Sequence, residues 1–145
     1  MYNFLVSTHS ILRWILAILL ILTILYAAVG RVQKKPFKQT RIFSLVSLIV
    51  LHLQFILGLI LYFVSPKVIF SSSSMKAPLT RFFLVEHLIA MLIAIVLITI
   101  GFSSAKRILD ETKKYNRILV YYIIGFLIIL AAIPWPFYNL GTDWL

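Results

Sequence analysis

Cysteine is absent from this chain, and acidic residues are scarce. The 145 residues include no cysteine and only four aspartates and glutamates. Without thiols, disulfide bonds, thiolate catalysis, iron–sulfur ligation and covalent attachment of c-type haem are excluded. No cluster of carboxylates and imidazoles occurs at ligand spacing, so zinc or copper hydrolysis is not expected. The HExxH, P-loop, GxGxxG and serine–histidine–acid patterns are also missing.

Charge of either sign is low, and apolar residues dominate. Charged residues make up 12% of the chain, whereas soluble domains carry about 25%. Hydrophobic residues make up 62%, which is more apolar surface than one small core can bury. The net charge of +10 lies in the connections between apolar runs rather than in one nucleic-acid-binding stripe. This pattern predicts that the chain interacts with the lipid bilayer and not with nucleic acid.

Four apolar runs approach or exceed the roughly 20 residues that a helix needs to cross hydrocarbon. They predict an all-α fold, a four-helix transmembrane bundle formed by one membrane domain over residues 1–145. The predicted helices cover residues 4–29, 42–64, 82–102 and 118–137. The last run is short, and Pro134, Trp135 and Pro136 extend it as an interfacial cap.

The connections between these helices indicate their orientation. The first connection carries five basic residues and no acid: Arg31, Lys34, Lys35, Lys38 and Arg41. The third carries five basic and two acidic residues, while the segments before the first helix and after Pro134 carry no lysine or arginine. The positive-inside rule therefore places both termini and the serine-rich connection at 71–74 outward. We expect a multi-pass protein of the inner (cytoplasmic) membrane without a cleavable signal peptide, because the first apolar run is too long for one.

The only three histidines, His9, His52 and His87, lie within the predicted spans. An ionisable side chain in hydrocarbon costs roughly 2–3 kcal/mol, so it usually has a partner or a function. Imidazole is also the side chain best suited to ligating a metal or haem iron. These three residues are therefore the candidate site.

Helical periodicity directs two of the histidines toward the interior of the bundle. Arg13 shares the face of His9, and a buried arginine avoids lipid. Ala94 and Gly101 lie on the face of His87, where small residues let helices approach closely and leave room for a flat cofactor.

Depth distinguishes the third histidine. At 1.5 Å per residue, His9 lies roughly 7–10 Å and His87 roughly 8–10 Å below the outer helix ends. His52 lies roughly 18 Å deep, opposite a second polar stripe that contains Gln54 and Gly58, so the inner face of its helix is ambiguous. Two axial ligands of one haem need nearly equal depth, which favours His9 with His87.

These features favour one haem b near the outer surface, with His9 and His87 as ligands of its iron. Arg81 and Arg13 are the candidate partners of the propionates. An alternative pair is His52 with His87, which would leave His9 at the rim. Histidines that only hydrogen-bond across helices are a further interpretation.

Four segments carry a resemblance to a known family: 9–14 (HSILRW), 52–63 (HLQFILGLILYF), 81–87 (RFFLVEH) and 133–137 (IPWPF). With them, nearly the whole chain resembles small four-helix bacterial membrane proteins labelled cytochrome b-like, which implies haem binding. The chain is more distantly similar to the copper-resistance D and HemJ-type protoporphyrinogen oxidase families, which share a histidine in an early helix. HemJ-type enzymes also use a lysine in a later helix, and no predicted span here contains one, so their activity is not expected.

Together these observations predict a membrane b-type haem protein that transfers electrons between a quinol and a redox partner, as a subunit of a respiratory complex. Ligation by two histidines closes both axial positions, which favours electron transfer over oxygen chemistry. Two alternatives stay open: a non-catalytic subunit or scaffold with structural histidines, and a small quinone-dependent oxidoreductase that uses Glu86 and His87. The sequence leaves homo-oligomer formation open.

Overall fold

The computed structural model describes residues 1–140, which form helices and short connections without a β-strand. The elements in order are α1 (Tyr2–Val32), α2 (Lys38–Val64), the 3-10 turn η1 (Ser72–Lys76), α3 (Pro78–Arg81), the π-helical turn η2 (Phe82–Glu86), α4 (His87–Ala105), α5 (Glu111–Ala132) and the 3-10 turn η3 (Pro136–Tyr138). Because α3, η2 and α4 run on as one helix, the described chain has four long helices.

Each of these four helices is long and apolar enough to cross a membrane. Even the shortest, α5 with 22 residues, extends about 33 Å, which exceeds the roughly 30 Å of hydrocarbon in a bilayer. Large apolar side chains along the outer faces of the helices are exposed, as expected where lipid is the solvent. The predicted all-α architecture with four possible spans is therefore confirmed.

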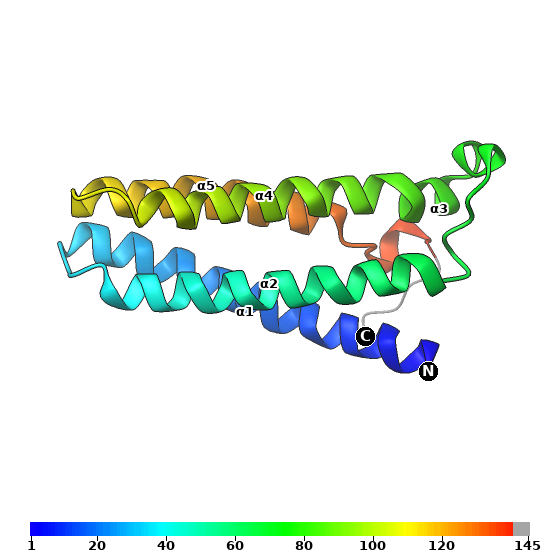
Figure 1. Ribbon diagram of the computed structural model, residues 1–145, viewed down its shortest axis with the longest axis horizontal. Helices are drawn as coiled ribbons and strands as arrows, with labels where there is room; N and C mark the ends of the chain where they lie inside the picture. The colour runs from blue at the N-terminus through cyan, green and yellow to red at the C-terminus, as the bar shows by residue number, and fades with distance from the viewer. Residues whose placement is uncertain (141–145) are drawn as a thin grey trace.

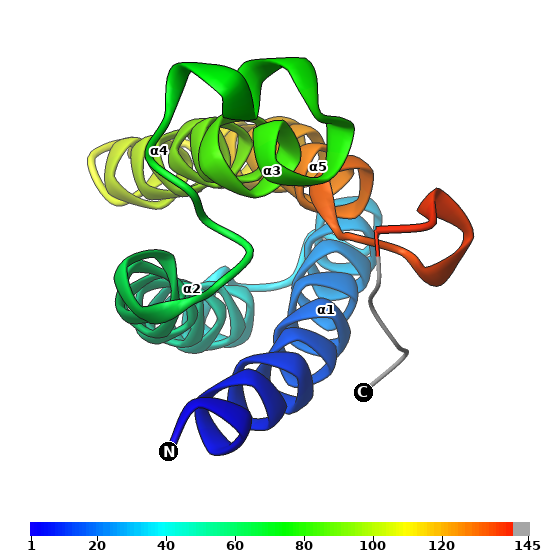
Figure 2. The same cartoon turned by 90° about the vertical axis from the view of Figure 1, so that its right-hand side faces the viewer.

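The four helices form two antiparallel hairpins, α1–α2 and α4–α5 (Figure 1). α1 also packs against α5, whereas α2 and α4 pack less closely against each other (Figure 2). One end of the bundle carries the two connections from α1 to α2 and from α4 to α5, and we call it the basic end. The opposite end, where α1 begins and α5 stops, is called the histidine end.

The helices at the basic end begin earlier than the predicted ranges. α2 begins at Lys38 and α5 at Glu111, rather than at residues 42 and 118. Polar residues continue both helices beyond the apolar run, and the first turn of α5 is capped. The Asp110 carboxylate accepts a hydrogen bond from the Lys113 backbone N–H at 2.7 Å, which satisfies one free donor of the helix start.

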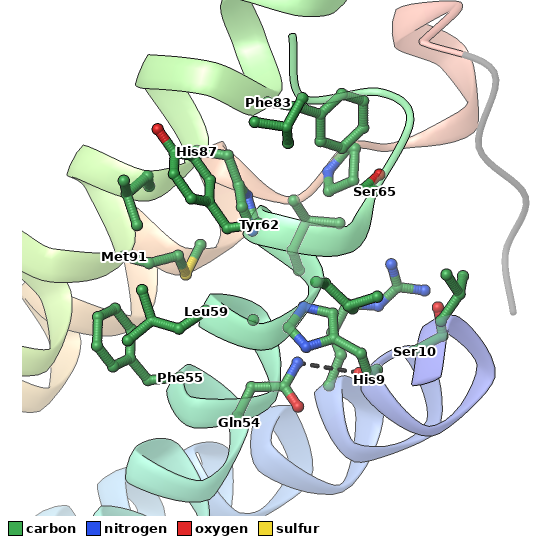
Figure 3. A pocket seen from close by; sticks show the side chains of 18 of the residues that line it. His9, Ser10, Gln54, Phe55, Leu59, Tyr62, Ser65, Phe83, His87 and Met91 are labelled. Atoms are coloured by element: carbon green, nitrogen blue, oxygen red, sulfur yellow. Dashed lines mark hydrogen bonds between the residues drawn. The ribbon is translucent and has the colours of Figure 1, made fainter. Parts of the chain in front are cut away.

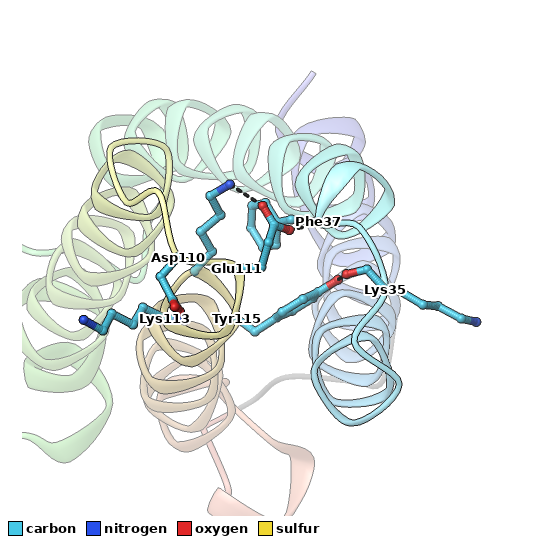
Figure 4. A network of polar contacts seen from close by, with 7 residues as sticks. Lys35, Phe37, Asp110, Glu111, Lys113 and Tyr115 are labelled. Carbon is cyan, nitrogen blue, oxygen red and sulfur yellow. Dashed lines mark hydrogen bonds and ion pairs between the residues drawn. The ribbon is translucent and has the colours of Figure 1, made fainter.

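Polar contacts join the two connections at the basic end (Figure 4). The Tyr115 hydroxyl donates to the Lys35 carbonyl oxygen at 2.9 Å. The Phe37 backbone N–H donates to Oε2 of Glu111 at 2.8 Å. Gly30 lies directly against the Tyr115 ring, where a Cβ atom would be 2.8 Å from Cε1. The end of α1, the start of α2 and the start of α5 are thereby held together.

Two further contacts fasten the helices within the core. The Tyr122 hydroxyl, fully buried, donates to the Ser44 carbonyl oxygen at 2.8 Å and so joins α5 to α2. The hydroxyls of Thr23 and Ser47 lie 2.8 Å apart between α1 and α2. Gly125 lets α5 approach α4, since a Cβ atom there would lie 2.5 Å from Cγ1 of Ile98.

The Tyr122 hydrogen bond provides a test of this packing. We expect Tyr122→Phe to lower the free energy of unfolding by about 1 kcal/mol, because the buried bond to Ser44 is lost without a change in ring volume. The measurement is unfolding in mixed detergent micelles with increasing denaturing detergent. Tyr121→Phe is the matched control, since its hydroxyl makes only an exposed contact with Arg117 at 3.5 Å. Equal losses in the two variants would contradict the proposed role of the buried bond.

Candidate functional site

A cavity of about 290 Å³ opens among α1, α2 and α4 at the histidine end. Its wall is mostly apolar and includes residues from α5 and from the segment after α2. Polar side chains of the long helices line it, among them His9, Gln54 and His87 (Figure 3). Arg13 of α1 also lines it. The structure thus brings together two of the three histidines with one of the two predicted arginines.

His9 projects from α1 toward α2. Gly58 of α2 leaves space for the ring, because a Cβ atom there would lie 3.2 Å from Cε1 of His9. The side-chain nitrogen of Gln54 donates to the backbone carbonyl of His9 at 2.9 Å. Nδ1 of His9 and Oε1 of Gln54 are buried and have no hydrogen-bond partner within residues 1–140. Such atoms are costly in an apolar setting, so a ligand that bonds them would be stabilised.

His87 projects from the start of α4 and is held by α5. Its Nδ1 lies 2.7 Å from the backbone carbonyl oxygen of Ala132. A carbonyl oxygen only accepts, so Nδ1 carries the proton and Nε2 carries the lone pair. Metal-binding histidines are commonly oriented in this way, with one ring nitrogen donating to a carbonyl and the other free to bind.

Two prolines after α5 explain why the Ala132 carbonyl is open to a hydrogen bond from His87. In a helix, the carbonyl of residue i accepts from the N–H of residue i+4, and proline has no N–H. Pro136 therefore leaves the Ala132 carbonyl without its helical donor, and Pro134 does the same to Leu130. The indole Nε1 of Trp135 donates to the Leu130 carbonyl at 2.8 Å, while the imidazole of His87 donates to Ala132. The motif that ends α5 thus determines where the His87 ring points.

A π-helical turn directly precedes His87. The turn η2 covers Phe82–Glu86 and adds one residue to the helical turn, so it changes the direction of the side chains that follow. It brings the buried Phe82 ring to 5.8 Å from the His87 ring, centre to centre. Turns of this kind are often found at functional sites. The apolar pattern of these residues does not differ from that of a regular helix, so the turn could not be predicted from the sequence.

His52 and Arg81 lie outside the cavity. His52 is exposed on α2, and its Nδ1 is 2.8 Å from the Leu48 carbonyl oxygen of the same helix. Arg81 forms an ion pair with Glu86, with 2.6 Å between Nε and Oε1, and both side chains are nearly half exposed. The ambiguity of α2 is thereby resolved, since the stripe containing Gln54 faces the interior and the stripe containing His52 faces outward.

Residues that the sequence analysis did not assign to the site also shape the cavity. Lys67, just after α2, lines it with Arg13 and adds a second cation. The Tyr62 hydroxyl donates to the Leu84 carbonyl at 3.1 Å and so fastens α2 to η2 beside His87. This bond depends on how α2 and η2 pack against each other, so the sequence carried no signal for it. Within residues 1–140, no three histidine, cysteine or acidic side chains lie together as metal ligands.

The two cavity histidines have different partners, which predicts different effects on stability. In protein free of cofactor, His87→Leu should lower the free energy of unfolding by about 1–3 kcal/mol, because the Ala132 carbonyl loses its donor. His9→Leu should leave the stability unchanged or raise it, because it removes a buried nitrogen without a partner. His52→Leu is the exposed control. Equal destabilisation by the substitutions at His9 and His87 would contradict this assignment of hydrogen bonds.

Comparisons with known proteins add no assignment to this geometry. No family model matches the chain, no curated protein matches it, and no solved structure matches it. The resemblance of the segments around His9, Gln54, His87 and Trp135 to cytochrome b-like membrane proteins therefore stays a prediction. The site is defined by its own residues.

Proposed function

We propose that this protein is an integral membrane b-type haem protein in which His9 and His87 are the axial ligands. One observation carries the proposal: imidazoles from two different helices line the same cavity, while the third histidine is exposed elsewhere. The proton on Nδ1 of His87 leaves Nε2 available for iron. The Nδ1 atom of His9 is buried, has no hydrogen-bond partner among residues 1–140, and is the candidate iron-binding atom of that ring.

The remaining wall of the cavity supports this assignment. It is largely apolar, which suits a macrocycle, and its two cations, Arg13 and Lys67, are the candidate partners of the propionates. Lys67 takes the role that the sequence suggested for Arg81, which is paired with Glu86 instead. A space of about 290 Å³ encloses less than a whole porphyrin. We therefore expect the wall of the cavity to open further when haem binds.

When bound, haem iron supplies one-electron chemistry between its ferrous and ferric states. The chain itself orients the two imidazoles, fixes the tautomer of His87 through Ala132 and excludes water with apolar side chains. Held by two histidines, such a group would favour electron transfer over reactions with oxygen. We propose transfer between a quinol and a redox partner, within or beside a respiratory complex.

The membrane orientation forms part of the proposal. The charges of the two connections at the basic end place that end in the cytoplasm by the positive-inside rule. The histidine end and both termini would then face outward across the cytoplasmic membrane. The cavity would lie near the outer surface, where a partner on that side can approach it.

A second candidate is a quinone site in the same cavity. It is favoured by two buried atoms that lack a hydrogen-bond partner in the described part of the chain, Nδ1 of His9 and Oε1 of Gln54. A quinol hydroxyl can donate to Oε1 of Gln54, since an amide oxygen only accepts. The volume of the cavity suits a single substituted ring better than a porphyrin. In this function His9 would exchange a proton with a hydroxyl group of the quinol.

Absorption spectra test the haem proposal. Protein purified in mild detergent from haem-replete cells should show a Soret band that shifts on reduction. We expect His9→Ala and His87→Ala to lose this band, because each removes an axial imidazole. His52→Ala is the matched control, with the same change in an exposed histidine, and it should keep the band.

Three outcomes would contradict the proposal in different ways. A colourless protein that is folded and stable would exclude haem binding. Loss of the band in His52→Ala alone would show that the ligands are assigned wrongly. A colourless protein that retains a quinone, and loses it in Gln54→Leu, would support the second candidate instead.

A further inference from the structure

A second hollow, of about 630 Å³, lies at the basic end of the bundle. Six basic side chains surround it. The connection between α1 and α2 and the start of α2 contribute Lys34, Lys35, Lys38 and Arg41. Lys106, at the end of α4, and Lys114, in α5, complete the set. One carboxylate, that of Glu111, shares the hollow. The charge around it is therefore strongly positive.

The single carboxylate is already engaged. Glu111 accepts hydrogen bonds from the Lys114 ammonium group and from the Phe37 backbone N–H. Lys114 also lies over the Phe37 ring, 5.8 Å from its centre. The other five cations form no ion pair with any residue in the range 1–140. Most of the positive charge is consequently available to an outside anion.

The hollow lies at the depth of lipid headgroups. α1 ends at Val32 and α4 ends at Ala105, while α2 and α5 begin at Lys38 and Glu111. The hydrocarbon layer must therefore end beside the hollow. Phe37 and Ala105 in its lining are buried, so the cations and the depth of the hollow are the two features that a ligand meets. A ligand with a charged phosphate and an apolar body matches both features.

The backbone of Lys34 has a conformation that costs free energy for any residue except glycine. Lys34 has φ 51°, the left-handed conformation that glycine adopts most easily. It ends α1 in a Schellman motif, with Lys35 N–H bonded to the Gly30 carbonyl at 3.0 Å and Lys34 N–H to the Arg31 carbonyl at 3.4 Å. Glycine is the usual residue at this position, so lysine introduces strain that a function of its charge would explain.

We propose that this hollow binds the phosphate headgroup of an anionic phospholipid. The positive-inside rule explains why cations occur in these connections, but it does not require them to converge on one hollow. Arg31, Arg107, Lys113 and Arg117 occupy the same end and do not line it. Basic pockets between membrane helices on the cytoplasmic side are known to hold anionic headgroups. This site is separate from the cavity of His9 and His87, and it does not depend on the proposed haem.

Lipid retention tests the proposal. The protein is equilibrated in nanodiscs with equal amounts of phosphatidylglycerol and phosphatidylcholine, and the lipids that stay bound after release are measured by native mass spectrometry. We expect phosphatidylglycerol to be retained preferentially. The variant Lys38→Gln/Arg41→Gln should reduce this preference, by up to about 30-fold for two charges. The matched control Arg107→Gln/Lys113→Gln removes two charges outside the hollow and should retain it.

Lys34→Gly separates binding from folding. Because glycine relieves the left-handed strain, this variant should unfold at a higher temperature than the parent protein, and yet retain up to about fivefold less phosphatidylglycerol. Higher stability with unchanged retention would remove Lys34 from the site.

Other outcomes would overturn the proposal as a whole. Equal losses in the two double variants would indicate diffuse attraction by the whole basic end. Full displacement of phosphatidylglycerol by inorganic phosphate would indicate a site for a soluble anion. An absence of preference in the parent protein would exclude the site.

Discussion

Every backbone carbonyl within a membrane needs a hydrogen-bond donor, because lipid provides none. In this bundle, Pro134 and Pro136 remove the donors that Leu130 and Ala132 would have had in a longer helix. Trp135 satisfies the first carbonyl within its own segment. His87 satisfies the second from the neighbouring helix α4. The packing of α4 on α5 and the orientation of the proposed ligand therefore depend on the same bond.

Hydrogen bonds join the helices at both ends of the bundle. At the basic end, Tyr115 and Glu111 connect α5 to the segment between α1 and α2, and Tyr122 adds a buried bond to α2. At the histidine end, α2 is fastened to the α4 side by Tyr62 through the π-helical turn. The cavity lies at this end, where His9 faces Gly58 instead of a bulky side chain. The cavity at the histidine end therefore owes its space to a small residue opposite His9, while hydrogen bonds join the helices around it.

The positions of the site residues were partly predictable. Helical periodicity placed Arg13 on the face of His9, and both line the cavity. The same arithmetic left α2 undecided, because its two polar stripes were each compatible with an inner face. Packing selects the stripe of Gln54, whose amide reaches the His9 carbonyl, and leaves His52 outside. Arg81 was expected to bind a propionate because of its position at the outer end of its helix. In the folded chain its guanidinium pairs with Glu86 instead, which position along the helix does not reveal.

The sequence by itself determined the class of this protein. Low charge and long apolar runs predict helices that satisfy their own backbone in lipid, and residues 1–140 contain four helices long and apolar enough to span a membrane. Only the tertiary structure decided which polar groups meet. The bond from His87 to Ala132 joins residues 45 positions apart, and the hollow around Lys38 joins two separate connections. Periodicity describes the direction of a side chain about its own helix axis, whereas a site depends on how neighbouring helices are rotated and placed, and that is determined by packing.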